Sequence, residues 1–251
     1  RRQRQMCIRD RCETNRYTIS GTIPKRKDRY RLYLSIARPD SLLITDLQEK
    51  FQTAGIEVKN SNLGQLSETT WFHYPSDYLG DIVHSLNVRS DNLYAESILR
   101  LLSLSAHEKG SVEKGIDIIR KYWQNYEADS LELFMYDGSG LARNNKVSAK
   151  YLNCVLKETA RDSLIGEYFV QTLPLAGKEG SVSTFMKHGE LPGELRLKSG
   201  SMSDVHAYAG YYTTPQNRYA IVVMINNYTC TRAQLKQKIS ALLTQVLSKK
   251  E

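Results

Sequence analysis

Apolar residues in the last third of the chain alternate with polar ones in the way that is typical of β-strands. Three such segments, residues 195–201, 206–213 and 218–226, are separated by polar turns. In the third, residues 219–225 are almost continuously apolar, which predicts a strand covered on both faces. A C-terminal helix is expected next, and the residues assigned to its apolar side are Leu235, Ile239, Leu242, Leu243 and Val246.

The middle of the chain instead repeats apolar residues at helical spacing. From Pro75 onward the spacing predicts a series of helices: one ending near Asn87, and others over 93–104, from Ser111 to about Trp123, over 148–159 and over 162–172. Asp137–Gly140 is expected to form a turn after a short extended run. Helices gathered in the middle and antiparallel strands at the end predict an α+β fold.

The first seventy residues are less regular. Strands are predicted over 16–23 and 30–36, with a charged turn between them. A helix follows, capped by Asp40 or Ser41 and stopped at Gly55. A brief strand over 56–58 and a polar connector complete this part of the chain.

Charge is concentrated at the start of the chain. The formal net charge is +8, but residues 1–11 hold five arginines and one aspartate, and the remaining 30 basic and 26 acidic residues leave +4. This stretch has no apolar period, cap or turn signal, and it resembles adapter read-through at the ends of metagenomic reading frames. It is therefore predicted to be a non-native leader. The alternative is a basic arm, but no basic stripe with interleaved aromatic residues follows, so no nucleic-acid partner is expected.

Several classes of protein are disfavoured by what the sequence contains. No apolar run approaches the ~20 residues of a transmembrane helix, and no export signal is visible. The four cysteines form no C-x-x-C pair, and no Cys/His cluster occurs, so no metal site, cofactor or disulfide framework is expected. The five histidines show no ligand spacing and are interpreted as surface or structural residues.

Residues 195–202 carry a lysine, a hydroxyl and a glycine in a row. On a strand, Leu197 and Ser199 point to one face and Lys198 to the other, so a solvated edge lysine explains this segment taken alone. The Ser90–Asn92 segment is equally ambiguous, because Ser, Asp and Asn are all good helix caps. Their order indicates chemistry, since Ser-Asp-Asn followed by Lys-(Thr/Ser)-Gly belongs to a set that begins with Ser-x-x-Lys.

Each residue type in this set has a role in acyl transfer. The hydroxyl of Ser90 can relay a proton to a leaving amine, and the amide of Asn92 can orient a substrate carbonyl. Lys198 supplies positive charge, and the hydroxyl of Ser199 can bind a carboxylate. A backbone N–H just past Gly200 can donate to an oxyanion.

Four motifs occur in this order along the chain: Ser90–Glu96, Asp137–Asn144, Leu173–Gly177 and Lys198–Ser201. Together they resemble the D-alanyl-D-alanine carboxypeptidase/endopeptidase family, the class C low-molecular-mass penicillin-binding proteins. The resemblance runs from about Tyr17 to the C-terminus.

This resemblance implies the fold and its divisions. It implies a penicillin-binding-protein/β-lactamase-like transpeptidase fold that is incomplete here, with a helical subdomain, three C-terminal antiparallel strands and a C-terminal helix. Residues 12–70 then form the end of an inserted accessory region and a connector, and residues 71–251 the C-terminal part of the serine peptidase domain. Two N-terminal strands of the family's sheet are missing, so the 218–226 strand is expected at an unpaired edge.

The resemblance also implies an activity. It is that of a periplasmic serine hydrolase that removes the terminal D-alanine from peptidoglycan stem peptides or cuts cross-bridges, through an acyl-enzyme and without metal or cofactor. β-Lactams are expected to acylate the full-length protein. The residues implied as catalytic are Ser90, Asn92 and Lys198, and those implied as substrate-binding are Ser199, Gly200, Ser201, Arg143 and Met202.

Two of these implied substrate-binding residues have specific expected roles. The guanidinium of Arg143 is expected to reach the carboxylate on the side chain of the stem peptide, because arginine binds carboxylates bidentately. Met202 is expected to form part of the pocket wall. A solvated turn arginine and ordinary packing are the respective alternatives.

The chain departs from the family pattern at two points. Ser199 stands where threonine is usual, and it keeps the hydroxyl. No Ser-x-x-Lys precedes Ser90, and the only such pattern, Ser111–Lys114, is interpreted as the cap of a helix. The attacking serine is therefore expected in an N-terminal part outside this fragment. The alternatives are a non-catalytic module that binds cell-wall peptides and a β-lactamase-like hydrolase, which lacks the Asp137–Leu141 block.

Overall fold

The computed structural model describes the chain in several stretches: residues 7–11, 16–20, 36, 38–58, 73, 75–106, 109–126, 129–186 and 191–248. They belong to two compact units, Arg1–His73 and Tyr74–Glu251. The second unit contains every candidate site residue. The assignment of 12–70 to an accessory region and of 71–251 to the peptidase domain stays a prediction.

The first unit contains a hairpin and a helix. β1 (Cys7–Arg11) pairs antiparallel with β2 (Arg16–Ser20), so a strand forms within the stretch that has no apolar period. Backbone groups make such a ladder, and it does not require an alternating apolar face. That residues 1–11 are a non-native leader stays a prediction. The predicted strand over 30–36 lies outside the described residues except for its last residue, Ile36.

The helix of this unit, α1 (Pro39–Thr53), begins earlier than predicted. Arg38 occupies its N-cap position and Pro39 its first turn, so the prediction that Asp40 or Ser41 caps it was wrong. Proline suits the first turn because its fixed φ is helical and its missing N–H is not needed there. The helix stops before Gly55, whose φ is +73°, as predicted. Residues 56–58 are coil, so the predicted strand there was wrong.

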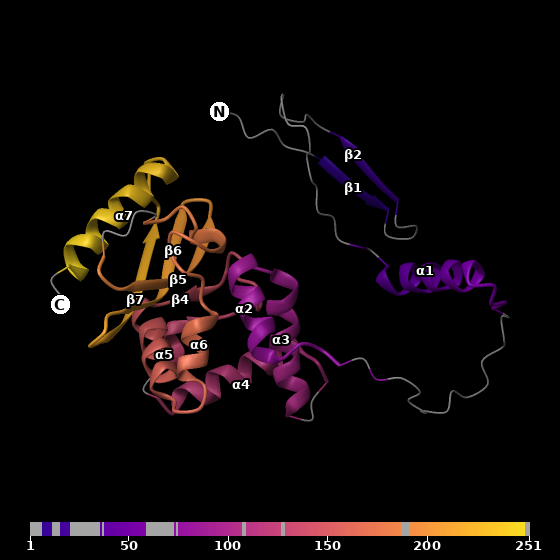
Figure 1. Cartoon of the computed structure of the whole chain (residues 1–251), viewed down its shortest axis with the longest axis horizontal. Coiled ribbons are helices and arrows are strands. Elements are labelled where there is room, and N and C mark those ends of the chain that lie inside the picture. Colours follow the sequence, from indigo (N-terminus) through magenta and orange to yellow (C-terminus); the bar gives the residue numbers. More distant parts are fainter. Residues whose placement is uncertain are drawn as a thin grey trace. The chain divides into compact units, whose positions relative to one another are not determined.

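A three-stranded antiparallel sheet organises the second unit (Figure 1). Its order is β5 (Glu194–Met202), β6 (Val205–Thr213) and β7 (Arg218–Asn226), which confirms the three predicted strands. Two residues connect β5 to β6, so Met202 pairs with Val205 and the register of the hairpin follows from the turn. Among the described residues, β7 pairs with β6 alone and forms an edge of the sheet, as expected.

Helices cover both faces of this sheet (Figure 1). On one face α7 (Arg232–Leu247) buries Leu235, Ile239 and Leu243 against Leu197 and Tyr208 of the strands. On the other face lie α5 (Ala149–Arg161) and α6 (Gly166–Thr172), which pack against alternate residues of β6 and β7. The nearly continuous apolar run of β7 is thereby explained.

The predicted apolar side of α7 was partly wrong. Leu242 and Val246 are exposed, and Leu247 is buried in their place. The buried residues follow one another at spacings of four from Leu235 and face the sheet. Leu242 and Val246 each precede a buried residue by one position, and a step of one residue rotates the side chain about 100° away from the sheet.

The remaining helices form the rest of the α part of an α+β fold. They are α2 (Leu79–Arg89), α3 (Asn92–Ser105) and α4 (Val112–Gln124). Between α4 and α5 the 3₁₀ turn η1 (Ser130–Glu132) leads into β3 (Leu133–Phe134), which pairs with β4 (Lys146–Val147). The predicted helix positions are thus confirmed, except that the helix predicted over 162–172 begins only at Gly166. The extended run expected over 131–135 is also shorter, since β3 covers two residues.

Candidate active site

The end of helix α2 is held in a fixed position. The side-chain amide of Asn87 donates to the hydroxyl of Thr172 on α6 over 3.1 Å, and both residues are buried. Beyond Asn87, the helix closes at Ser90, whose N–H donates to the carbonyl of Leu86. Ser90 has φ +55° and ψ +52°, the left-handed conformation that a residue with a Cβ rarely adopts. A strained serine at a helix end marks it as a functional candidate.

The Ser90–Asn92 segment can be interpreted either as a helix cap or as a set of catalytic residues, and the two interpretations apply to different residues. The carboxylate of Asp91 accepts from the N–H groups of Leu93 and Tyr94, so Asp91 is the N-cap of α3. The hydroxyl of Ser90 accepts from no backbone N–H of the described residues, which leaves it for other contacts. Asn92 is the first residue of α3 and is exposed.

The side chain of Lys198 bridges β5 and the end of α2. Its Nζ donates to Oγ of Ser90 over 2.8 Å and to the carbonyl of Ser199 over 3.0 Å. Lys198 is half-buried, and burial lowers the pKa of its ammonium because the charged form loses solvation. The lysine at the start of the Lys-Ser-Gly motif is therefore a contact of Ser90 and not a solvated edge residue.

One part of the β5 edge is covered and the next part is open. The N–H of Ala176 donates to the carbonyl of Leu195 over 2.8 Å, and the N–H of Leu197 to the carbonyl of Pro174 over 3.0 Å. Because backbone groups alternate in direction along a strand, those of Ser199 and Ser201 face the same edge. No described residue accepts the N–H of Ser201, which is thus available to a ligand.

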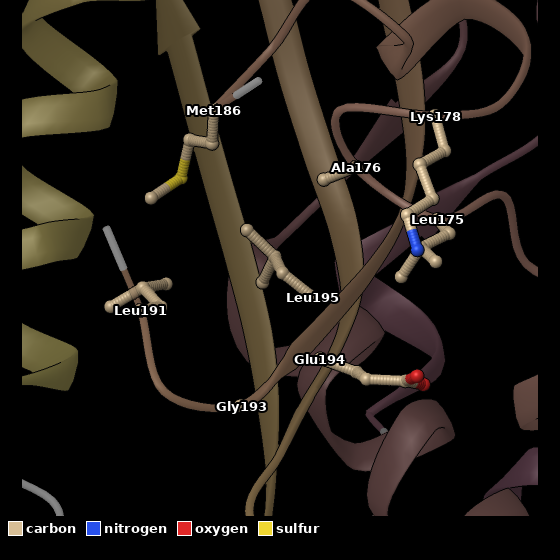
Figure 2. A pocket seen from close by; sticks show the side chains of 8 residues that line it. All are labelled: Leu175, Ala176, Lys178, Met186, Leu191, Gly193, Glu194 and Leu195. Atoms are coloured by element: carbon tan, nitrogen blue, oxygen red, sulfur yellow. The ribbon is translucent and has the colours of Figure 1, made fainter. Parts of the chain in front are cut away.

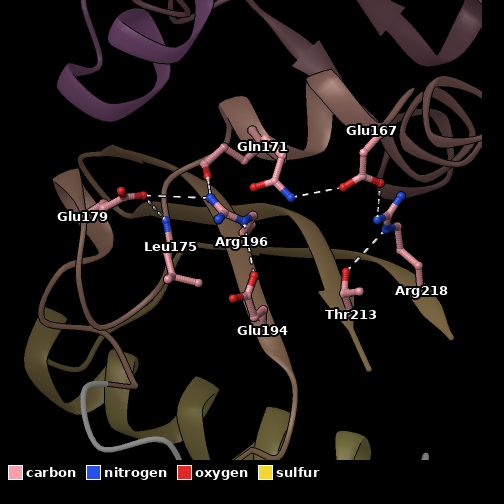
Figure 3. Close-up of polar contacts among 9 residues, drawn as sticks. Glu167, Gln171, Leu175, Glu179, Glu194, Arg196, Thr213 and Arg218 are labelled. Carbon is pink, nitrogen blue, oxygen red and sulfur yellow. Dashed lines mark hydrogen bonds and ion pairs between the residues drawn. The ribbon is translucent and has the colours of Figure 1, made fainter. Parts of the chain in front are cut away.

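Polar contacts fix the covering segment against β5 (Figure 3). Nη1 of Arg196 donates to the carbonyl of Leu173 over 3.0 Å and lies 4.0 Å from a carboxylate oxygen of Glu179. The same oxygen of Glu179 accepts from the N–H of Leu175 over 2.8 Å. These contacts explain why the Leu173–Gly177 motif belongs with the lysine strand.

The next turn of this segment brings a residue that the sequence reasoning missed. In η2 (Gly180–Val182), Oγ of Ser181 lies 2.7 Å from Oγ of Ser199. Gly180 has φ +51°, and a Cβ there would lie 2.3 Å from the carbonyl oxygen of Val88, so this turn also contacts α2. No periodicity relates Ser181 to β5, because the contact depends on how the turn packs.

A second missed residue lies across the hairpin from Ser201. Oγ of Ser201 is 2.7 Å from Nδ1 of His206, a side chain only 2% exposed. The two residues are cross-strand partners. A two-residue turn at Ser203 and Asp204 predicts this pairing, so the hairpin register is the signal that could have found it.

The other candidate residues, which are Asn92, Gly200, Met202 and Arg143, form no hydrogen bond with Ser90 or Lys198 in the described part of the chain. Gly200 is exposed, and an added Cβ there would meet nothing within 4 Å. Met202 is half-buried at the end of β5, and Arg143 is exposed in the loop after Gly140.

The Asp137–Gly140 turn docks onto α3 near Asn92. Oε1 of Glu96, one helical turn beyond Asn92, accepts from the N–H groups of Gly138 and Ser139 over 3.1 and 3.0 Å. A Cβ on Gly138 would lie 2.7 Å from the carbonyl oxygen of Ala95, so only glycine permits this approach. The loop that carries Arg143 is thus attached to the helix that begins at Asn92.

We expect acid to loosen this loop. The carboxylate of Asp137 accepts from the N–H groups of Gly140 and Ala142 and from the amide of Asn145, over 2.6 to 2.8 Å. Burial alone would raise the pKa of Asp137, but these hydrogen bonds outweigh it and lower the pKa overall. Its contribution to stability is therefore complete above the unfolded value of about 3.9 and is lost as the pH falls through the lower folded value.

The variant Asp137→Ala should lower the free energy of unfolding at neutral pH by about 2 kcal/mol, because three hydrogen bonds to a charged group are lost. Urea unfolding at neutral and acidic pH measures this. The difference in the free energy of unfolding between the wild type and Asp137→Ala should shrink below pH 4, since the wild-type carboxyl is then being protonated. An Asp137→Ala effect that is equally large in acid would contradict the assignment.

Two pockets lie away from this group of residues. One, of about 220 Å³, lies beside β5 and is lined by Met186, Leu191, Leu195 and neighbouring residues (Figure 2). The other, of about 380 Å³, lies between α2 and α6. Neither is lined by Ser90, Asn92 or Lys198. The candidate site is the open edge of β5 beside the end of α2, where Lys198 meets Ser90.

Several known proteins are similar to this chain in sequence and in fold. Residues 2–249 match the D-Ala-D-Ala carboxypeptidase 3 (S13) family. The chain is 25% identical over 244 residues to the D-alanyl-D-alanine carboxypeptidase DacB of Haemophilus influenzae, which covers 92% of this chain and 50% of that protein. It is 24% identical over 228 residues to a D-alanyl-D-alanine carboxypeptidase of Actinomadura sp., which covers 86% of this chain and 42% of that protein.

A solved structure shows the same fold. The crystal structure of penicillin binding protein 4 from Haemophilus influenzae, complexed with a β-lactam, has a TM-score of 0.77 and 23% identity, covering 97% of this chain and 59% of that chain. The chain spans about half the length of the curated relatives it matches. The match over residues 2–249 confirms the family that the four motifs predicted, and this chain belongs to the D-Ala-D-Ala carboxypeptidase 3 (S13) family.

Proposed function

We propose that the polypeptide carrying this chain is a serine-type D-Ala-D-Ala carboxypeptidase or endopeptidase that acts on peptidoglycan stem peptides through an acyl-enzyme. The observation that carries the proposal is the hydrogen bond between Nζ of Lys198 and Oγ of Ser90 at an open strand edge. The family membership of the chain supports the same activity. The names of the relatives, carboxypeptidases that include a penicillin-binding protein, agree with it.

The attacking serine, in this proposal, comes from residues outside the 251-residue chain. Ser111 belongs to the only Ser-x-x-Lys pattern, and its hydroxyl accepts from the N–H of Lys114 as the N-cap of α4. The same hydroxyl donates to Glu113 over 2.6 Å. Both contacts are those of a helix cap and not of a nucleophile paired with a base.

The contacts of Lys198 provide a route for the proton that the leaving group needs. The attacking serine gives its proton to a base, which in this proposal also lies outside the chain, and its oxygen bonds to the carbonyl carbon of the substrate. The bond to the terminal D-alanine then breaks, and the nitrogen of D-alanine must be protonated. The hydroxyl of Ser90 can donate to this nitrogen while Nζ of Lys198 donates to Ser90. The lowered pKa of Lys198 makes this transfer easier. Water then cleaves the acyl-enzyme and releases the shortened peptide.

The edge of β5 can bind the terminal carboxylate of the peptide and the carbonyl oxygen of the bond that is cleaved. The hydroxyls of Ser199 and Ser201 can donate to the terminal carboxylate, and the N–H of Ser201 to the developing oxyanion. A β-lactam carries a carboxylate and a reactive carbonyl in a similar arrangement, so acylation of the complete polypeptide by penicillins is expected.

The proposed substrate, peptidoglycan, implies that the complete polypeptide works in the periplasm. Over the described residues, no helix combines the length and apolarity that a membrane crossing requires.

A fluorescent penicillin and a D-alanine assay together test the proposal. The complete polypeptide should be labelled covalently and should release D-alanine from a peptide that ends in D-alanyl-D-alanine. The 251-residue chain alone should not be labelled. Labelling of the chain alone at Ser111 would overturn the assignment of the motifs.

A second function is favoured by the cap geometry of Ser111. If no upstream segment supplies a serine and a base, the chain is a module that binds cell-wall peptides without cleaving them. Binding of the peptide without release of D-alanine by the complete polypeptide would identify this module.

The variant Arg143→Ala should discriminate between substrates. If the guanidinium binds the side-chain carboxylate of the stem peptide, its removal should lower kcat/KM for that peptide about tenfold or more, because a charge-assisted hydrogen bond is lost. Acylation by a simple penicillin, which lacks this carboxylate, should change little. Lys121→Ala, an exposed change on α4, serves as the control. Equal effects of Arg143→Ala on both reactions would refute this role.

A further inference from the structure

His206 lies directly beside one of the two hydroxyls that line the open strand edge. It is the cross-strand partner of Ser201, and the backbone groups of Ser201 point away from β6. Such a pair places its side chains close together. The imidazole is 2% exposed, and its ring meets that of Tyr208 edge-on, with centroids 4.8 Å apart. Nδ1 of His206 lies 2.7 Å from Oγ of Ser201.

The hydroxyl of Ser201 has one proton, and its direction decides what the residue can bind. If Ser201 donates this proton to an unprotonated Nδ1 of His206, only lone pairs face the edge, and these repel a carboxylate. If Nδ1 carries a proton and donates it to Oγ, the proton of Ser201 is free to point outward. Anion binding at Ser201 therefore requires a particular protonation state of His206.

The surroundings of Nε2 favour the state with the proton on Nδ1. Nε2 is buried and has no partner among the described residues, so a proton there would be a buried donor without an acceptor. Arg232 and Lys236 of α7 add to the effect of burial in lowering the pKa of His206. The positive potential of Arg232 and Lys236 thus favours the neutral ring over the doubly protonated one, and the missing partner of Nε2 favours the neutral form with its proton on Nδ1. The partner of His206 on β7 is the uncharged Ile225.

We propose that His206 is a positioning residue, which donates its Nδ1 proton to Ser201 and thereby directs the hydroxyl of Ser201 toward the carboxylate of a bound peptide. The identity of the ligand rests on the proposed function, whereas the position of the proton is a property of this chain alone. Ser199 differs, because its partner Ser181 has a hydroxyl that can rotate to donate or accept. Only Ser201 is oriented by a buried ring.

Nitrogen-15 NMR of the full chain, labelled on histidine, tests the position of the proton. The variant His206→Asn assigns the signal among the five histidines. At neutral pH, Nδ1 of His206 should carry the proton and Nε2 should not. A proton on Nε2 would overturn the proposal, whatever the chain binds.

Peptide binding to the same chain tests the consequence. The probes are a short peptide ending in D-alanyl-D-alanine and the same peptide amidated at its C-terminus. The variant His206→Leu should weaken binding of the free acid about tenfold and leave binding of the amide unchanged. His206→Asn should retain most of the affinity, because its side-chain amide can still donate to Ser201. Thermal unfolding of each variant shows that the chain remains folded.

A double-mutant cycle measures the interaction between His206 and Ser201. If His206 acts through Ser201, His206→Leu should cause no further loss in a chain that already carries Ser201→Ala. Equal losses for acid and amide, or additive losses in the double variant, would show a merely structural role. Failure of the wild-type chain to bind either peptide would overturn the proposed ligand, and the NMR measurement would still decide the position of the proton.

The pH dependence of binding gives an independent readout. A bound carboxylate favours the doubly protonated form of His206, so affinity for the free acid should rise as the pH falls toward the pKa of this residue, which burial lowers. This rise should be absent for the amidated peptide and for His206→Asn. A rise that persists in His206→Asn would exclude His206 as its source.

Discussion

Replacing Lys198 with methionine should lower the rate of D-alanine release by the complete polypeptide about a thousandfold, within the range of general acid–base catalysis. Methionine retains the length and the apolar stem of lysine but removes the ammonium that donates to Ser90. Ser90 then lacks the group that donates to it while it passes its own proton to the leaving nitrogen. Because Lys198 is only half-buried and forms no ion pair with a described residue, the free energy of unfolding should change little.

The partner residue and a matched lysine complete this experiment. Ser90→Ala should cause a loss of the same order, and the double variant should be no worse than either single variant, because the two residues act in one proton path. Lys178→Met, an exposed change in the segment beside β5, should leave the rate unaltered. Full additivity of Ser90→Ala and Lys198→Met would contradict a shared path, as would rates close to wild type in both.

Replacing Gly210 with alanine should destabilise the second unit by about 3 kcal/mol, at the upper end of overpacking effects. A Cβ at Gly210 would lie 2.0 Å from the carbonyl oxygen of Arg196 and 3.0 Å from Cα of Leu197, and backbone atoms cannot rotate away as a side chain can. The strands β5 and β6 must separate to make room. Urea unfolding of the 251-residue chain measures the loss.

Gly200 provides a matched control on the neighbouring strand. An added Cβ there meets nothing within 4 Å, so Gly200→Ala should change the free energy of unfolding by less than about 1 kcal/mol. The same variant should weaken binding of a D-alanyl-D-alanine peptide, because the Cβ enters the open edge where the ligand approaches. Equal destabilisation by Gly200→Ala and Gly210→Ala would contradict the packing described for the sheet.

Much of the second unit could be predicted because its local signals agree with its packing. The alternation in 195–201 reports a strand with one apolar face, and Leu195 and Leu197 are indeed buried. The cap chemistry of Ser111 also holds, since the contacts of its hydroxyl, with Glu113 and the N–H of Lys114, are confined to one helical turn. Elements of this kind are encoded within a few residues.

Predictions that depended on what covers an element were less successful. Leu242 and Val246 are apolar and lie close to the buried row of α7, yet they are exposed, because the sheet covers a narrower stripe than the sequence offers. The cap assigned to Asp40 or Ser41 failed for a local reason, since Pro39 already begins the helix. The short apolar run over 56–58 has no neighbouring strand among the described residues.

The sequence by itself determined the family, the fold class and the identity of Ser90, Lys198 and Ser199 as candidates, because motif order and strand periodicity are linear properties. The tertiary structure decided which atoms meet. Lys198 donates to Ser90 across a separation of 108 residues, and Ser181 and His206 each contact one hydroxyl of β5. A periodic pattern predicts which face of an element is buried. Only the packing of elements and turns decides which side chain from another part of the chain contacts that element.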